Sequence, residues 1–208
     1  MSEGPAERGR LIIMVREPRL GAVKTRLAAE IGTVEAIRFY RSATAALIRR
    51  LAFDRRWKTV LAAAPDTARM SGSWPAGVQR VAQGGGDIGA RMGWLLRSQA
   101  GPAVLIGSDI PGIEASHIAE AFMLLRRNDA VLGPAEDGGF WLVGLKPLPR
   151  LRDIFRNVRW SSPDALGDTL VNLAGRKVGF AARLADVDDR ETYWRTGANA
   201  IRVTQRKG

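Results

Sequence analysis

The sequence feature that most constrains the fold is the segment Val104–Gly112, in which an apolar stretch ends at the carboxylate of Asp109. Such a run needs burial on both faces, which is typical of a strand in an α/β sheet. In open α/β sheets the ligand crevice lies beyond the carboxyl ends of the strands. We therefore expect Asp109 to lie where a metal ion or a substrate is held.

A second acidic segment follows within the stretch Leu132–Leu145. Glu136 and Asp137 stand there before two glycines, and glycine lets the backbone approach a ligand closely. Two acidic strand ends in one α/β chain suggest a metal-dependent site for an anionic, nucleotide-linked substrate.

The composition excludes several kinds of site. The 208 residues include no cysteine and a single histidine, His117, which we expect to be an ordinary helical residue. A disulfide framework, a thiolate or multi-histidine metal site and a cysteine nucleophile are therefore excluded, and a reducing cytoplasm is favoured. No segment reaches the ~18 apolar residues of a transmembrane helix. We expect a disordered leader over 1–9, a single domain over 10–203 and a frayed tail over 204–208.

The charge of the chain is strongly basic, with a formal net charge of +11 and 27 arginines against 5 lysines. Arginine suits bidentate recognition of phosphate, so a nucleic-acid partner is one hypothesis. The basic residues are nevertheless spread along the whole chain and do not interleave with stacking aromatics. A solvated, arginine-biased surface is the favoured interpretation, and a nucleic-acid partner is not expected.

Hydrophobic periodicity predicts alternating strands and helices. We expect strands at 10–16, 57–64, 78–83, 103–107, 129–134, 139–145 and 178–183, and helices capped by Thr33, over 87–99 and 116–127, from Ser161 and from Asp189. This alternation implies right-handed crossovers and a three-layer α/β/α sandwich with a mostly parallel sheet. The strand pair around 136–139 departs from it and is expected to add an antiparallel edge.

The segment Gly84–Gly89 matches the pattern G-x-G-x-x-G of dinucleotide-binding proteins. The strand before it is too polar, and too late in the chain, for the first strand of such a domain. We interpret the glycines as a turn that supplies positive φ angles before a helix. The N–H groups at that helix start could still hold a phosphate or a ribose hydroxyl, which makes Gly86, Asp87 and Arg91 candidate nucleotide-binding residues.

A basic segment follows the first predicted strand. We expect a loop over 16–26, in which Arg16, Arg19, Lys24 and Arg26 could converge on one anion. A solvated basic loop is the alternative. The position beyond the carboxyl end of a strand favours phosphate binding, for which Arg16, Lys24 and Arg26 are the candidates.

Six segments of the chain together resemble one family. They are Leu11–Leu27, Gln83–Met92, Gly107–Pro111, Gly133–Leu145, Trp160–Ser162 and Asp186–Glu191. In this order they are similar to the bacterial glycosyltransferase-A-like family of nucleotide-diphospho-sugar transferases, over roughly residues 10 to 195. The resemblance implies the nucleotide-diphospho-sugar transferase (glycosyltransferase-A) type of α/β/α sandwich.

The resemblance also implies a nucleotide bound with Mg²⁺ or Mn²⁺. Asp109 matches the acidic position that binds metal in such folds, and Asp186 and Asp188 match a second metal-binding position. Lys24 and Arg26 match the basic loop expected near the phosphates.

The leading functional hypothesis is a metal-dependent transferase that uses a nucleotide-sugar donor. The metal and the basic loop would neutralise the leaving nucleotide diphosphate. Glu136 or Asp137 is the candidate base for the acceptor hydroxyl, with structural turn residues as the alternative. Phe140 and Trp141 are candidates for the acceptor pocket, with core packing as the alternative.

Two other hypotheses remain open. The segment Lys24–Leu27 also resembles the loop of guanylyltransferases that act on a small phosphorylated substrate, which favours a nucleotidyltransferase that releases pyrophosphate. A non-catalytic nucleotide- or nucleic-acid-binding protein is the third, and it would bind without metal and with a steep salt dependence.

Overall fold

The computed structural model describes residues 8–19, 23–147, 153–184 and 193. The predicted tail and most of the predicted leader lie outside these residues. Within the leader, the carbonyl of Gly9 accepts a hydrogen bond from the N–H of Lys58 at 2.9 Å. Backbone pairing with the neighbouring strand therefore begins no later than Gly9.

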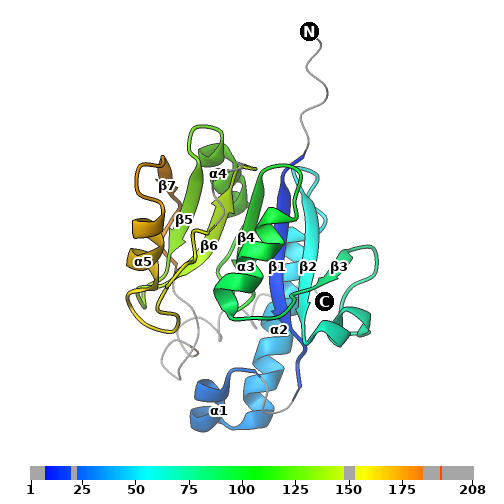
Figure 1. Cartoon of the computed structure of the whole chain (residues 1–208). Coiled ribbons are helices and arrows are strands. Elements are labelled where there is room, and N and C mark those ends of the chain that lie inside the picture. The colour runs from blue at the N-terminus through cyan, green and yellow to red at the C-terminus, as the bar shows by residue number, and fades with distance from the viewer. Residues whose placement is uncertain (1–7, 20–22, 148–152, 185–192, 194–208) are drawn as a thin grey trace.

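A seven-stranded sheet forms the middle layer, in the order β3-β2-β1-β4-β6-β5-β7 (Figure 1). Its strands are β1 (Arg10–Arg16), β2 (Lys58–Ala64), β3 (Gln79–Ala82), β4 (Ala103–Gly107), β5 (Ala130–Pro134), β6 (Phe140–Leu145) and β7 (Val178–Phe180). The sheet is mostly parallel, as predicted, and each predicted strand is found, although the last ends at Phe180.

The antiparallel strand is not at the edge of the sheet, where the sequence pattern placed it. Strand β6 lies between β4 and β5 and runs antiparallel to both. Five of its six residues are buried, in the pattern iBBBBB. A strand that is apolar on both faces needs a central position, which explains why the β5–β6 hairpin inserts β6 beside β4.

Helices cover both faces of the sheet. They are α1 (Thr25–Ile31), α2 (Thr33–Leu51), α3 (Ile88–Arg97), α4 (Ala115–Leu125) and α5 (Ala165–Asn172), with a 3₁₀ turn η1 (Asp66–Met70). On one face, Leu11 and Ile13 of β1 share a core with residues of α2 and α4. On the other face, Ile12 of β1 shares a core with residues of α3 and the end of α5. The three-layer sandwich is therefore confirmed, and no described helix is long and apolar enough to cross a bilayer.

Three helix predictions need correction. The predicted loop 16–26 ends in helix α1, which begins at Thr25 and packs on α2 through the buried Leu27. Thr33 is the first residue of α2, and Gly32 takes the N-cap position. Helix α5 begins at Ala165, later than the predicted start at Ser161. The helix predicted from Asp189 lies outside the described residues.

The turn between β5 and β6 depends on Gly138. Its φ is +86°, and a Cβ at this position would lie 2.3 Å from the carbonyl oxygen of Pro163. The close backbone approach that the sequence suggested for a ligand is thus made to another segment of the same chain. This contact ties the turn to the start of α5, where the N–H of Leu166 donates to the carbonyl of Gly138 at 3.1 Å.

We predict that Gly138→Ala lowers the free energy of unfolding by at least about 2 kcal/mol, because a side chain here is strained in φ and also meets backbone. Gly167→Ala is the matched control, since its Cβ would meet nothing within 4 Å inside α5. In the helix interior this control is expected to stabilise by about 0.5–1 kcal/mol. Urea unfolding measures both changes, and equal effects would contradict the prediction.

Candidate functional site

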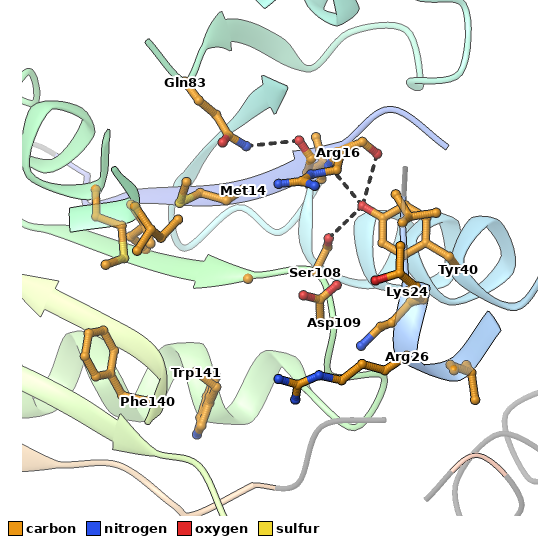
Figure 2. A pocket seen from close by; sticks show the side chains of 18 of the residues that line it. Met14, Arg16, Lys24, Arg26, Tyr40, Gln83, Ser108, Asp109, Phe140 and Trp141 are labelled. Atoms are coloured by element: carbon orange, nitrogen blue, oxygen red, sulfur yellow. Dashed lines mark hydrogen bonds between the residues drawn. The ribbon is translucent and has the colours of Figure 1, made fainter. Parts of the chain in front are cut away.

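A cavity of about 490 Å³ lies beyond the carboxyl ends of β1 and β4 (Figure 2). Its polar lining comes from the strand ends and the segment after β1. Arg16 ends β1, Gln83 follows β3, and Ser108 and Asp109 follow β4. This is the position where parallel α/β sheets hold ligands, because the backbone diverges there to leave a crevice.

Six of the residues singled out in the sequence line this cavity together. They are Arg16, Lys24, Arg26, Asp109, Phe140 and Trp141. Figure 2 shows Lys24 and Arg26 extending from the start of α1 toward Asp109, with Phe140 and Trp141 along another wall. Segments far apart in the sequence thus form one site with cationic, acidic and aromatic sides.

The glycine-rich turn before α3 forms as predicted, but its candidate nucleotide-binding residues are not among the described lining of the cavity. Gly84 and Gly86 have φ angles of +79° and +88°, which confirms a turn that supplies positive φ before a helix. Gly86, Asp87 and Arg91 do not appear among the described residues that line the cavity. Asp87 is the N-cap of α3 and accepts from the N–H of Ala90 at 2.7 Å, while the Arg91 side chain donates to the carbonyl of Gly86 at 2.9 Å.

The face of α3 that meets the cavity is apolar. Ile88 and Met92 line it, and they stand one helical turn apart. Asp87 and Arg91 lie at other angles around the helix and satisfy the helix start. Their predicted role with a nucleotide stays a prediction.

Glu136 and Asp137 lie in the turn between β5 and β6, outside the described lining of the cavity. Asp137 accepts from the N–H of Gly139 at 2.9 Å, an arrangement that stabilises a tight turn. Their predicted role as a base also stays a prediction.

Only one of the three predicted metal ligands lies within the residues that the structure describes. Asp109 lines the cavity, while Asp186 and Asp188 lie outside the described residues. Among the residues that the structure does describe, no three acidic or histidine side chains gather as a metal site would require. Asp109 is therefore the one predicted ligand whose position is known.

Tyr40 of α2 is a site residue that the sequence did not single out. Its hydroxyl accepts from the N–H of Arg16 at 2.9 Å and lies 3.0 Å from the carbonyl oxygen of Arg16 and 3.2 Å from Ser108 Oγ. One hydroxyl thereby links the end of β1 to the residue before Asp109. Burial raises the pKa of Tyr40, and the charge of Asp109 adds to the rise, so this hydroxyl keeps its proton.

Gln83 is the second site residue that the sequence did not single out. Its Nε2 donates to the carbonyls of Val15 at 3.0 Å and Ala62 at 2.9 Å, which lie near the ends of β1 and β2. Two carbonyl partners require the amide nitrogen on that side, which assigns the oxygen to the other. Gln83 is buried and lines the cavity, so its Oε1 is a fixed acceptor to which no described residue donates.

Lys24 has a strained backbone. It is the N-cap residue of α1 with φ 48° and ψ 48°, in the left-handed region. For a residue with a side chain this conformation costs about 1–2 kcal/mol. Strain of this kind concentrates at functional sites, where the surrounding structure holds it.

The aromatic wall is fixed by contacts behind it. Trp141 is 5% exposed, and its Nε1 donates to the carbonyl of Ala182 at 3.0 Å. His117 packs edge-on against Trp141 with ring centroids 6.0 Å apart, and its Nδ1 accepts from the N–H of Glu114 at the start of α4. His117 is thus the satisfied helical residue that was expected. Phe140 stacks on Phe155 with centroids 6.3 Å apart.

Comparisons with known proteins find one matching family and many solved structures with the same fold. A family profile described as "Uncharacterized protein conserved in bacteria (DUF2064)" matches residues 47–162, more than half of the chain. No curated protein matches the chain.

Solved structures share the fold across nearly the whole chain. A "putative nucleotide-diphospho-sugar transferase" from Desulfovibrio desulfuricans superposes with a TM-score of 0.83 at 24% identity, over 96% of both chains. Rv0371c from Mycobacterium tuberculosis, in a complex with manganese, has a TM-score of 0.53 at 17% identity, over 92% of this chain and 98% of that one. CMP:2-keto-3-deoxy-manno-octonic acid synthetase with CTP has a TM-score of 0.60 at 10% identity, over 95% and 100%. The predicted nucleotide-diphospho-sugar transferase fold is confirmed.

The strain at Lys24 gives a prediction that separates the effect of its ammonium group on binding from the effect of its backbone conformation on stability. Lys24→Ala and Lys24→Gly both remove the ammonium group, so both should weaken nucleoside diphosphate binding by about tenfold or more. Glycine tolerates positive φ, so Lys24→Gly should be about 1 kcal/mol more stable than Lys24→Ala. Calorimetric titration and urea unfolding measure these effects. Equal loss of nucleoside and diphosphate binding would instead point to a folding defect.

The Tyr40 hydroxyl gives a second prediction. Tyr40→Phe leaves the polar groups at the end of β1 without their partner and should lower the free energy of unfolding by about 1–3 kcal/mol. The control is Tyr193→Phe, since the only other tyrosine has a hydroxyl 3.3 Å from Glu35 Oε1. Urea unfolding should show a smaller loss for the control, and a harmless Tyr40→Phe would contradict the linking role.

Proposed function

We propose that this chain, which belongs to the bacterial DUF2064 family, is a metal-dependent transferase that uses a nucleotide-sugar donor. The observation that carries the proposal is the meeting of Lys24, Arg26 and Asp109 in one cavity at the strand ends. Cations beside a carboxylate suit a metal-bound diphosphate, because both the metal and the anion need partners of opposite charge. The fold of the D. desulfuricans protein supports it.

The divalent ion would be held by Asp109, joined by Asp186 and Asp188 from the late segment. The residues fit such an ion in kind, since carboxylate oxygens are the ligands that Mg²⁺ and Mn²⁺ prefer. The manganese complex of Rv0371c favours the same class of ion. When bound, the ion would neutralise the charge that develops on the leaving diphosphate.

The side chains of the chain itself have separable roles. Lys24 and Arg26 bind the phosphates, and a charge-assisted hydrogen bond from each contributes about 1.5–3 kcal/mol. The fixed Oε1 of Gln83 suits a donor group of the donor nucleotide, such as an N–H of a base. The rigid wall of Phe140 and Trp141 offers an apolar surface to a sugar ring or to an apolar acceptor.

The acceptor hydroxyl also needs a base. Glu136 or Asp137 remains the candidate, but reaching the acceptor from the β5–β6 turn would require the acceptor itself to extend beyond the cavity. Replacing each by its amide should lower transfer without changing donor binding, which distinguishes a base from a turn residue.

A nucleotidyltransferase is the second candidate. The basic start of α1 beside Asp109 equally suits a triphosphate whose α-phosphorus is attacked by a phosphorylated substrate. The shared fold of the synthetase that binds CTP supports this reading. The apolar wall favours the first candidate, because a second phosphate gains nothing from Phe140 and Trp141.

The deciding experiment offers the protein nucleotide-sugars and nucleoside triphosphates with Mn²⁺ and identifies the products. We expect release of a nucleoside diphosphate from a nucleotide-sugar. Asp109→Asn should abolish turnover and the Mn²⁺-dependent rise in melting temperature with nucleotide. Asp153→Asn, an exposed position outside the cavity, is the control and should change neither.

Two outcomes would contradict the proposal. Pyrophosphate from a triphosphate, with no turnover of any nucleotide-sugar, would replace it by the nucleotidyltransferase. Unchanged metal-dependent stabilisation in Asp109→Asn would remove Asp109 from the metal site.

A further inference from the structure

A second cavity, of about 700 Å³, lies between helix α2 and the loop that follows η1. Its apolar floor includes Ala45, Ile48 and Trp74, and its rim carries Arg38, Arg41 and Arg49. Tyr40 also lines it, so one side chain borders both cavities. A volume of this size lies in the range of small-molecule sites.

The rim is positively charged. Arg38 stands 3.8 Å from Glu35, whereas Arg41 and Arg49 form no ion pair within the part of the chain that the structure describes. The described residues that line this cavity include no carboxylate. Charges that border a concave, apolar surface attract an anion more strongly than the same charges on open surface do.

The wall opposite α2 is held in place by Arg80 of β3. Its guanidinium donates to the carbonyls of Ser71 at 3.3 Å, Trp74 at 3.2 Å and Pro75 at 3.1 Å. The indole Nε1 of Trp74 donates to the carbonyl of Ala68 at 2.7 Å. These bonds build the loop around a fixed indole, so the cavity exists before any ligand binds.

Two arginines stand at the two ends of the apolar floor along α2. Arg41 and Arg49 are eight residues apart, which is about 12 Å along a helix, and Ala45 and Ile48 lie between them. A bare phosphate would contact one end and leave the floor empty. A ligand with an apolar body covers the floor and brings its anionic group to a guanidinium.

From this arrangement we propose a second ligand site, which binds a small organic anion that joins an apolar body to a phosphate or carboxylate group. The body packs on Trp74, Ile48 and Ala45, and the anionic group pairs with Arg41 or Arg49. The site is separate from the cavity of the proposed transferase, with Tyr40 as the shared wall.

The test uses nuclear magnetic resonance of the nitrogen-15-labelled full chain, with phenyl phosphate as the probe. The chain has six tryptophans, and the indole signal that disappears in Trp74→Phe identifies Trp74. Titration with phenyl phosphate should change the chemical shift of this signal until the site is saturated. Benzoate tests the carboxylate, while phenol and inorganic phosphate should each bind at least about tenfold more weakly, because each lacks one of the two contacts. Nucleotide and metal are omitted, so the result is independent of the transferase proposal.

Two variants test the two halves of the site. Arg41→Gln with Arg49→Gln should weaken phenyl phosphate by about tenfold or more, whereas Arg127→Gln, at an exposed position outside the lining of this cavity, should not. Ala45→Leu keeps a good helix former and fills the floor, so it should abolish the saturable shift while the melting temperature stays close to that of the native chain.

Three results would overturn the proposal. The first is a Trp74 signal that phenyl phosphate does not move. The second is an equal loss of affinity in Arg127→Gln, which would indicate attraction to the general surface charge. The third is salt-dependent binding of a single-stranded oligonucleotide through Arg41 and Arg49 without saturable binding of phenyl phosphate, which would assign this face to a polyanion.

Discussion

The hydroxyl of Tyr40 holds together the two strand ends on which the site depends. It bonds to both backbone groups of Arg16 and to the side chain of Ser108, so β1, β4 and α2 meet at one atom. Gln83 makes the corresponding link between the ends of β1 and β2. Parallel strands normally diverge beyond their last ladder bond. These two side chains fix how the strand ends separate. This separation sets the positions of Asp109 and of the basic segment after β1.

Each kind of side chain in the site comes from a different segment of the chain. The cations come from the segment after β1, the carboxylate from the loop after β4, and the apolar wall from β6. The insertion of β6 beside β4 brings Phe140 and Trp141 opposite the cations. An antiparallel strand at the sheet edge would have placed both rings away from the cavity. The topology of one hairpin therefore decides that two aromatic side chains line the cavity.

Part of the large positive charge of the chain lies at the two cavities. Arg16, Lys24 and Arg26 face the first cavity, while Arg38, Arg41 and Arg49 border the second. Other arginines are structural: Arg159 pairs with Asp164 and Asp168 beside α5, and lowers the pKa of Asp168 to about 2. The net charge therefore says little by itself about the function of the chain, because a guanidinium can bind a ligand or can instead stabilise a helix start or a loop.

The sequence by itself determined the layered α/β class, the seven strands and half of the site. Apolar runs and their periods are local properties, and Asp109 lies just after a predicted strand while Lys24 and Arg26 lie in the basic segment that follows another. Tertiary structure decided the rest. A tyrosine in an apolar helical stripe and a glutamine at a short strand end carry no local signal of a site. The position of β6 and the second cavity likewise depend on which segments pack side by side, and strand order arises from the burial of whole faces rather than from any local pattern.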